Sequence, residues 1–452
     1  MNTSLDQAAP PRSRPRVRLV PRGASRLSWL TLLNTWITWA LNVVTFTMLY
    51  NLGALIIEEF HLSPAAWGWL IAGYLGMRVV FDLPLTILSD RLGNGWRRRT
   101  VWFPVMIVYS ILAALVAVPG LTDTLLGLFL LLAGIALGTT ASEAIGVVAT
   151  VEWWPREHRG FAVGLHHTGY PIGAMLGGFF TSWVLSTFGE DSWRYAYLIG
   201  LATLPFAVWY WFLSRRHNFE TVTRETLARG LTPSVAETHD KVTVRSCLEV
   251  LRNRSVLIVA ACALLFQAMQ NVFQSSYPQY LKFVGGYSFA TVASLSVLWG
   301  ITGAFFQYLW PTLTDAIGRK WFILFAGAIQ ALVFVLLPVS TSLFGIVAVQ
   351  LLYGVTLNAV FPVLFSTASD IGGRRTGSVL GVVFTALWLG GVAGSLLASQ
   401  VLERNGGFAN AGAYYIVYGI MVGFSLLIIV LRAFAPETNP VRRAVTGRVG
   451  VR

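Results

Sequence analysis

The chain has 452 residues, of which 55% are apolar and 12% are charged, and its net charge is +13. Soluble proteins carry about 25% charged residues, so this composition argues for a protein embedded in lipid. A positive net charge would also suit a nucleic-acid-binding protein. Here, however, the basic residues lie in short links between long apolar runs, the distribution that orients membrane proteins. We therefore expect no nucleic-acid partner.

Twelve apolar segments are each long enough to cross a bilayer, because a hydrocarbon core about 30 Å thick needs roughly 20 residues of helix. An even number of spans places both termini on one side, and the basic tails identify that side as the cytoplasm. All Lys and Arg residues except Arg78, Arg194, Lys282 and Arg404 fall on this side. The predicted spans are 28–50, 65–89, 100–119, 125–152, 160–188, 193–214, 255–281, 288–313, 320–340, 343–369, 376–402 and 411–434.

The spans form two groups of six around one long polar connection. The first 27 residues are expected to be a disordered, basic tail beside the anionic inner leaflet. The expected organisation is a cytoplasmic tail (1–27), an N-terminal six-helix half (28–214), a cytoplasmic central loop (215–254), a C-terminal six-helix half (255–434) and a second cytoplasmic tail (435–452). The two cysteines, Cys247 and Cys262, give neither a disulfide framework nor a metal-binding spacing.

The fifth and eleventh spans carry the same small residues at one constant spacing, which indicates that the two halves arose by duplication. Parallel six-helix repeats describe an architecture of secondary transporters in which the substrate site lies near the middle of the membrane. The matched pairs are Gly160 with Gly377, Gly164 with Gly381, Thr168 with Thr385, Gly173 with Gly390 and Gly177 with Gly394.

A charged motif follows both the second and the eighth span. The first copy is Asp90-Arg91-Leu92-Gly93, and the second is Asp315-Ala316-Ile317-Gly318-Arg319-Lys320. The other motifs are Trp153-Trp154-Pro155-Arg156-Glu157-His158-Arg159-Gly160, Trp193-Arg194-Tyr195 and Pro436-Glu437-Thr438. On these residues the chain resembles the major facilitator superfamily over about 28–434. The resemblance implies an all-α integral membrane fold, with twelve transmembrane helices in two six-helix halves.

Two features bear on the subfamily. The stretch 152–178 looks most like the carboxylate and sugar-acid symporters of this superfamily. Drug antiporters of the superfamily carry a motif rich in glycine and proline in the fifth span, and this chain matches it in part, with the proline displaced. The matching residues are Gly169, Pro171, Gly173, Gly177 and Gly178.

The charged motif predicts a gate at the cytoplasmic helix ends. A carboxylate near a helix N-terminus is favoured by the helix dipole and can pair with arginine. Such a latch can hold the cytoplasmic side closed and break when that side opens; a static orientation device is the alternative. The candidate gating residues are Asp90, Arg91, Gly93, Glu152, Arg159, Asp315, Gly318 and Arg319.

Charged side chains within the spans are expensive to bury, so they are the first functional candidates. Arg78 and Asp82 in the second span are spaced to share one helix face and can form a self-neutralised structural pair. Alternatively, Arg78 binds a substrate carboxylate through two parallel hydrogen bonds. Asp82 then tunes Arg78 and takes part in proton coupling.

Glu143 in the fourth span and the His166–His167 pair in the fifth are candidates for proton transfer, because buried carboxyl groups and histidines can exchange protons near neutral pH. Adjacent residues point about 100° apart on a helix, so both histidines cannot face one cavity. We assign His166 to proton coupling and His167 to the substrate. The alternatives are a structural role for each group or, for Glu143, binding of a cationic substrate. We expect no metal site.

Polar stripes occur in the first and seventh spans, and the resemblance implies that spans 1, 4, 7 and 10 surround a central cavity. Such side chains can join helices to one another, but five on one face of the seventh span favour a wet cavity. The candidate substrate-binding residues are Asn34, Thr38 and Asn42 in span 1, Gln267, Gln270, Asn271, Gln274 and Tyr277 in span 7, and Tyr353 and Asn358 in span 10.

Together these features favour a proton-coupled symporter that carries a small organic anion, either a carboxylate or a sugar acid, by alternating access in the inner membrane. We expect it to work as a monomer whose partners are the substrate, protons and the bilayer. A proton-coupled efflux antiporter for drug-like or cationic compounds is the first alternative, and a transporter-like ligand sensor is the second. No nucleophile triad, metal cluster or phosphate loop occurs, so we expect neither an enzyme nor a cofactor.

Overall fold

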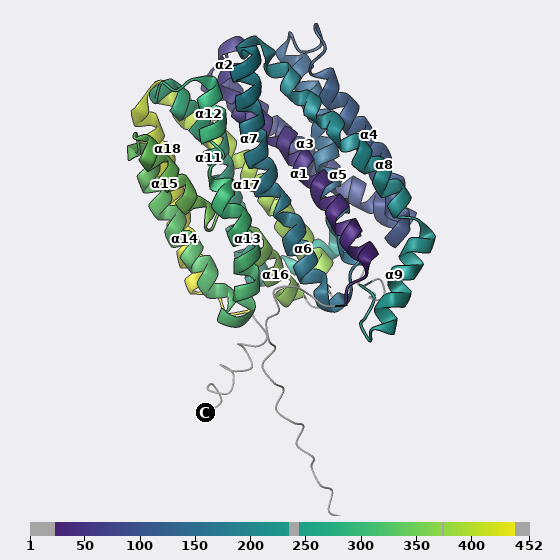
Figure 1. The fold of residues 1–452 in the computed structure, drawn as a ribbon. Helices are drawn as coiled ribbons and strands as arrows, with labels where there is room; N and C mark the ends of the chain where they lie inside the picture. Colours follow the sequence, from purple (N-terminus) through teal and green to yellow (C-terminus); the bar gives the residue numbers. More distant parts are fainter. Residues whose placement is uncertain (1–22, 235–243, 373–374, 439–452) are drawn as a thin grey trace, which may run out of the picture.

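The computed structural model describes residues 23–234, 244–372 and 375–438, and within these ranges the chain is a bundle of α-helices with no β-sheet (Figure 1). The side chains of Leu83, Thr86, Asp315 and Ala316 lie outside the described part as well. Most of the two predicted tails and part of the predicted central loop also fall outside it.

The first half of the bundle is built from eight helices and a long 3-10 segment. Ser63 accepts a hydrogen bond from the Ala66 amide and Pro64 occupies the first helical turn, so the predicted start of the second span is confirmed. The elements are α1 (Arg26–Asn51), α2 (Gly53–Glu59), α3 (Pro64–Leu92), η1 (Gly95–Arg98), α4 (Arg99–Leu115), α5 (Leu125–Glu152), η2 (Arg156–His158), α6 (Arg159–His167), α7 (Gly169–Phe188), η3 (Glu190–Ala202) and α8 (Thr203–Leu213).

Two short helices lie in the connection, and the second half follows. The connecting helices are α9 (Arg216–Ala228) and α10 (Val244–Val250). The second half consists of α11 (Arg254–Gln279), η5 (Tyr280–Val284), α12 (Phe289–Leu295), α13 (Trp299–Ile317), α14 (Arg319–Leu336), η6 (Leu337–Val339), α15 (Leu343–Gly354), α16 (Val360–Gly372), α17 (Thr376–Arg404) and α18 (Ala411–Ala433).

In the described part of the chain, 11 helices are long and apolar enough to cross a membrane. They match eleven of the predicted spans. The tenth predicted span, 343–369, is divided between the shorter apolar helices α15 and α16. The fifth is also interrupted, at Thr168, between α6 and α7. Pro171 lies three residues later and has no N–H to donate to the preceding turn, which accounts for this break.

Small residues bring helices of each half close together. A Cβ added to Gly173 of α7 would lie 2.4 Å from the carbonyl oxygen of Ala40 in α1. The repeat partner of Gly173 is Gly390 of α17, where an added Cβ would lie 2.1 Å from the carbonyl oxygen of Leu264 in α11. The same close contact therefore occurs in both halves.

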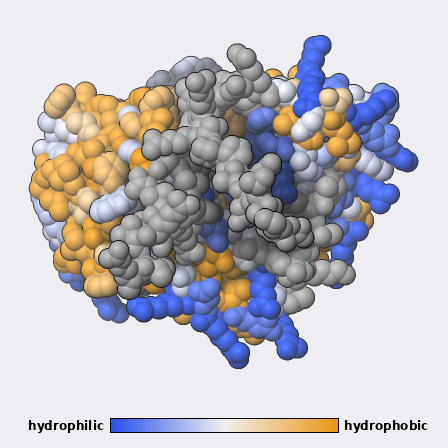
Figure 2. All heavy atoms as spheres, turned by 90° about the horizontal axis from the view of Figure 1, so that it is seen from below, coloured by the Kyte–Doolittle hydropathy of each residue, from blue (hydrophilic) through white to orange (hydrophobic). Residues whose placement is uncertain are grey.

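The first helix begins and the last helix ends at the same end of the bundle, which we call the tail end; the opposite end is the far end (Figure 1). Viewed from the tail end, hydrophilic side chains gather along the rim and one flank is largely hydrophobic (Figure 2). This distribution suits a bundle whose sides face lipid and whose ends face water.

The two halves are joined at the far end by polar contacts. The indole N–H of Trp67 in α3 donates to the carbonyl oxygen of Ser275 in α11 at 2.9 Å. The carboxylate of Glu403 in α17 accepts from the amide of Ala65 at the start of α3, also at 2.9 Å. Gly68 packs against Ser399 of α17. These contacts close the far end between α3 and the second half.

Candidate functional site

The centre of the site is an ion pair between two helices of the first half. Arg78 in α3 donates from Nη2 to Oε2 of Glu143 in α5. The Arg78 side chain is 2% exposed and that of Glu143 is 23% exposed. Among the described residues no ion pair joins Arg78 to Asp82, so the predicted pairing within one helix is wrong. Arg78 reaches across to the neighbouring helix instead, because α3 and α5 pack side by side.

Aromatic rings from both halves cover the Arg78 guanidinium. Its carbon lies 3.9 Å from the ring centroid of Trp388 in α17 and 5.0 Å from that of Phe46 in α1. Such cation–π contacts stabilise a buried cation. Nε and Nη1 of Arg78 are buried and have no hydrogen-bond partner among the described residues. Because a buried donor without a partner is unfavourable, these two groups are ready to receive an anion.

Amide side chains of α11 face the first half near this pair. The amide groups of Gln270 and Gln274 donate to the hydroxyl of Tyr170 in α7, at 3.2 and 2.9 Å. Gln270 also contacts the Asn358 oxygen at 3.5 Å. The hydroxyl of Tyr50 in α1 donates to Asn271 at 3.1 Å. Three residues of the predicted stripe, Gln270, Asn271 and Gln274, therefore contact the first half.

Tyr170 and Tyr50 were absent from the sequence-based candidates. Both are aromatic residues, and most aromatic residues in membrane helices pack or lie at interfaces, so neither was selected. Tyr170 also packs within 6.1 Å of the Trp299 ring and 6.2 Å of the Trp39 ring. A tyrosine hydroxyl that accepts from two amides of the opposite half is recognisable only after the helices are packed.

The polar stripe of span 1 contacts other parts of the first half in this conformation, and its role in substrate binding stays a prediction. Asn34 donates to the carbonyl oxygen of Phe206 in α8 at 3.0 Å. Thr38 bonds to the Asn34 carbonyl, and Asn42 bonds to the Thr38 carbonyl and to Met106 in α4. All three polar residues are fully buried. The stripe faces the interior of the first half because packing turns that face of α1 toward α4 and α8.

Two predicted tyrosines pack against aromatic rings of the second half, and their role in substrate binding stays a prediction. Tyr277 stacks on Phe273, with ring centroids 5.0 Å apart. Tyr353 packs edge-on against Phe273 and Phe334, at 4.7 and 5.7 Å. Gln267, another predicted residue of this helix, is buried.

The two histidines point in different directions, as the helix geometry predicts. Their rings are nearly perpendicular, with centroids 5.8 Å apart. His166 is fully buried and stacks against Trp39 at 6.4 Å. Both of its ring nitrogens are without hydrogen-bond partners. His167 is half-buried. Sequence spacing alone could not assign these environments.

A charged network closes the tail end of the first half. Arg98 donates to Asp90 at 2.6 Å and to the Glu152 carboxylate at 2.7 and 3.0 Å. The Gly95 amide also donates to Glu152, at 2.8 Å. Arg98, at the end of η1, therefore supplies the guanidinium that pairs with Asp90, and not the predicted Arg91. Gly93 has a φ of 113°, which favours glycine at the end of α3.

The second half carries a related network. Arg319 forms an ion pair with Asp370 at 2.8 Å, and the amides of Arg319 and Lys320 donate to Glu437 at 3.2 and 3.0 Å. Gly318 has a φ of 97°, like its counterpart Gly93. The side chain of Asp315 lies outside the described part of the structure. Asp370 and Glu437 were not predicted as gating residues.

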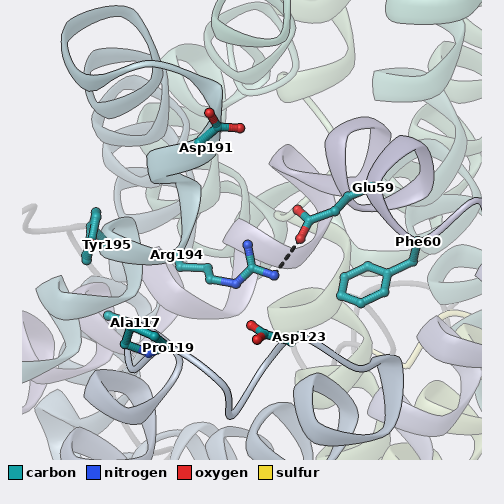
Figure 3. A pocket seen from close by; sticks show the side chains of 8 residues that line it. All are labelled: Glu59, Phe60, Ala117, Pro119, Asp123, Asp191, Arg194 and Tyr195. Carbon is teal, nitrogen blue, oxygen red and sulfur yellow. Dashed lines mark hydrogen bonds and ion pairs between the residues drawn. The ribbon is translucent and has the colours of Figure 1, made fainter.

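A separate pocket of 390 Å³ lies at the far end of the first half. Figure 3 shows the Glu59 and Asp123 carboxylates turned toward the Arg194 guanidinium. Arg194 pairs with Glu59, and the indole N–H of Trp193 donates to the same carboxylate at 2.6 Å. The motif around Trp193 thus braces this end of the half. The pocket is lined by Glu59, Phe60, Ala117, Pro119, Asp123, Asp191, Arg194 and Tyr195.

The fold and the central site define a polytopic helical membrane protein whose two halves meet around a buried arginine–carboxylate pair. Comparison with protein families supplies the particular family. The model of the Major Facilitator Superfamily matches residues 35–395 and 259–451. The chain belongs to this superfamily of membrane transporters, so it is a transporter and not an enzyme.

The sequence identity to named relatives is low, but the matched regions are long. The hexuronate transporter of Escherichia coli (strain K12) is 21% identical over 386 residues, which cover 82% of this chain and 85% of that protein. The galacturonate transporter of Dickeya chrysanthemi is 25% identical over 244 residues, covering 52% and 66%. A D-xylose-proton symporter structure shares 18% identity and a TM-score of 0.68, covering 91% of this chain and 98% of that one. This last likeness concerns the fold.

Proposed function

We propose that this protein is a symporter that carries a small hydroxylated organic anion together with a proton. The Arg78–Glu143 pair is the observation that carries the proposal. It places a buried guanidinium between the halves, and two of its donors have no partner. Arginine binds carboxylates through parallel hydrogen bonds, so a substrate carboxylate is the ligand that best fits these donors.

The same pair supports coupling to protons. When Glu143 is ionised it neutralises Arg78, and a second carboxylate brought to Arg78 would face the negative charge of Glu143. Like charges at close range disfavour ionisation, so binding of the substrate anion favours protonation of Glu143. Release of the anion favours the opposite change. The anion and the proton therefore bind together, and the central site stays near neutral during transport. Asp82 is one helical turn from Arg78 and is the second candidate carboxyl group.

The polar side chains on the opposite wall of the site favour a substrate that carries hydroxyl groups. Gln270, Gln274, Asn358 and Tyr170 offer amides and a hydroxyl to a ligand bound at Arg78. Relatives named for hexuronate, galacturonate and tartrate handle compounds that combine carboxylate and hydroxyl groups. We infer a sugar acid or hydroxy acid as the substrate of this chain.

Transport requires the site to open to each side in turn. The far end is closed by Trp67, Glu403 and Gly68, so we assign this conformation to the state closed toward the outside. The excess of basic residues at the tail end assigns that end to the cytoplasm of an inner membrane. Rocking of the halves 28–214 and 255–434 would then expose Arg78 alternately, with the tail-end networks as candidate gates.

Proteoliposomes that contain a pH-sensitive dye test the proposal. Hydroxylated carboxylates, neutral sugars and lipophilic cations would be added in turn. Internal acidification with one of the acids, and its loss in Arg78→Ala, is the expected result. Removal of hydrogen bonds to a charged group should weaken anion binding by at least about tenfold, because such bonds contribute about 1.5–3 kcal/mol. Internal alkalinisation with a cation, and no response to any acid, would instead assign the protein to the efflux antiporters.

A further inference from the structure

Consecutive arginines at the start of α4 face opposite ways. Arg98 is buried and bonds to Asp90 and Glu152 within the first half. Arg97 and Arg99 lie instead beside the indole of Trp96, with guanidinium carbons 5.2 and 5.5 Å from its centroid. Neither forms an ion pair within the described residues. The inward arginine is thus neutralised by protein carboxylates, whereas its two neighbours are not.

The end of α8 adds a third arginine to this cluster. Arg99 lies 4.6 Å from the ring centroid of Trp211 and donates to the Trp211 carbonyl oxygen at 2.9 Å. Arg215 lies 4.7 Å from the ring centroid of Phe212. The Nε atom of Arg99 is buried without a hydrogen-bond partner. Among the described residues, Arg215 also lacks a carboxylate partner. We call Arg97, Arg99 and Arg215, with Trp96 and Trp211, the arginine–tryptophan cluster.

Two arginines near this cluster, unlike its members, form ion pairs with glutamates. On α9, Arg216 pairs with Glu220 and Arg229 pairs with Glu225. The cluster therefore holds three positive charges without recorded acidic partners, where the surrounding surface mixes both signs. Such a concentration of cations attracts an anion, and a guanidinium binds a phosphate through two donors.

Apolar side chains continue from the cluster toward the middle of the bundle. The rings of Phe103 in α4 and Trp211 in α8 lie 5.0 Å apart where these helices pack. Further along the outer face of α8, Val208 is 44% exposed and Phe212 is 52% exposed. A free phosphate would use the arginines and leave this apolar surface uncovered. A phospholipid would use both, since its acyl chains lie along exposed helix faces.

We propose that the arginine–tryptophan cluster binds the headgroup of an anionic phospholipid, with acyl chains along the outer faces of α4 and α8. The phosphodiester would accept from Arg99, including its Nε, and from Arg97 and Arg215. Basic pockets between transmembrane helices on the cytoplasmic side suit such headgroups. This inference uses the tail-end orientation of the proposed function, but it does not depend on the transported substrate.

Native mass spectrometry of the full chain in detergent tests this site, with phosphatidylglycerol, phosphatidylethanolamine and inorganic phosphate as separate probes. The variant carries Arg97→Gln, Arg99→Gln and Arg215→Gln. Its matched control carries Arg216→Gln, Arg224→Gln and Arg229→Gln, which remove the same number of charges from α9. Arg215→Gln alone, an exposed position, provides a milder second variant if the triple variant does not fold.

We expect the unaltered protein to prefer phosphatidylglycerol to phosphatidylethanolamine. The triple variant should lose phosphatidylglycerol binding by at least about tenfold, because each arginine near an anionic surface changes affinity roughly fivefold; Arg215→Gln should show part of this loss. The control should keep its affinity. Equal losses in variant and control, equal binding of both lipids, or displacement of the lipid by inorganic phosphate would overturn the site. If the unaltered protein binds phosphatidylglycerol as expected but shows no uptake of any acid, the proposed transport function is wrong and the lipid site stands.

Discussion

Arg78 occupies an environment that an isolated charge would not tolerate. Its guanidinium lies between the rings of Trp388 and Phe46 and pairs with Glu143. Removing one partner of a buried ion pair leaves an uncompensated charge, which is costlier than removing both. The same argument applies to protonation. A proton on Glu143 leaves Arg78 unbalanced unless an anion arrives, so the pair links the two binding events at one place.

At the residue scale, Glu143→Gln should uncouple transport from protons. The glutamine keeps the size of the side chain but removes its charge and its titration. We expect substrate binding and exchange of labelled substrate across the vesicle membrane to continue, whereas uptake driven by a pH gradient falls at least about tenfold. Both activities can be measured in the same proteoliposomes. Glu220→Gln, on the exposed helix α9, is the matched control and should change neither. If Glu143→Gln retained gradient-driven accumulation, the coupling role of Glu143 would be wrong.

At the element scale, the two halves repeat one helix–helix contact. Gly173 and Gly177 of α7 lie against Ala40 and Val44 of α1. In the second half, the corresponding glycines of α17 pack on α11. Lipid tails provide no hydrophobic drive for helix association, so close van der Waals contact is the main attraction. The break at Thr168 separates this packed segment from α6. A Cβ added to either glycine of α6 would meet no atom within 4 Å.

Gly173→Ala should destabilise the α1–α7 contact. An added Cβ would lie 2.4 Å from the Ala40 carbonyl oxygen, so the helices must move apart. Overpacking typically costs about 1–3 kcal/mol, and we expect a lower unfolding temperature in detergent. Gly164→Ala on α6 is the control, because nothing lies within 4 Å of its added Cβ. Equal unfolding temperatures for the two variants would contradict this account of the contact.

At the scale of the whole molecule, the contacts between the halves differ between the two ends. Polar contacts join α3 to α11 and α17 at the far end. At the tail end, the rings of Phe161 and Tyr308 approach to 6.1 Å across the halves. Contacts that exist in one state only set the balance between states.

Weakening the far-end contacts should therefore favour the state that is open at the far end. The variant combines Trp67→Phe, which removes the bond to Ser275, with Glu403→Gln, which removes the carboxylate from the start of α3. Spin labels at Asp123 and Phe344, with Cys247 and Cys262 replaced by serine, report the separation of the far ends. We expect a longer distance population to grow. Glu190→Gln, also an exposed acid at the far end, should leave the distribution unchanged; no change in the double variant would refute this closure.

Much of the architecture follows from the sequence. Span length and apolar composition predict the membrane helices, since these depend on the thickness of the bilayer and not on neighbouring helices. The matched glycines of spans 5 and 11 indicate duplicated halves, and the structure contains a close helix contact at these glycines in each half. Arg78 and Glu143 stand out in the sequence because charges are rare within apolar spans. Asp90 was identified instead through the repeated charged motif, and Glu152 as a candidate member of the same network.

Only the tertiary structure decided which of these residues meet. Arg78 pairs with Glu143, which is distant in sequence, and not with Asp82 one turn away. The stripe of Asn34, Thr38 and Asn42 faces the interior of one half. Sequence spacing fixes which residues share a face of a helix. It does not fix how the helix is rotated in the bundle, because that rotation depends on the packing of side chains contributed by several other helices.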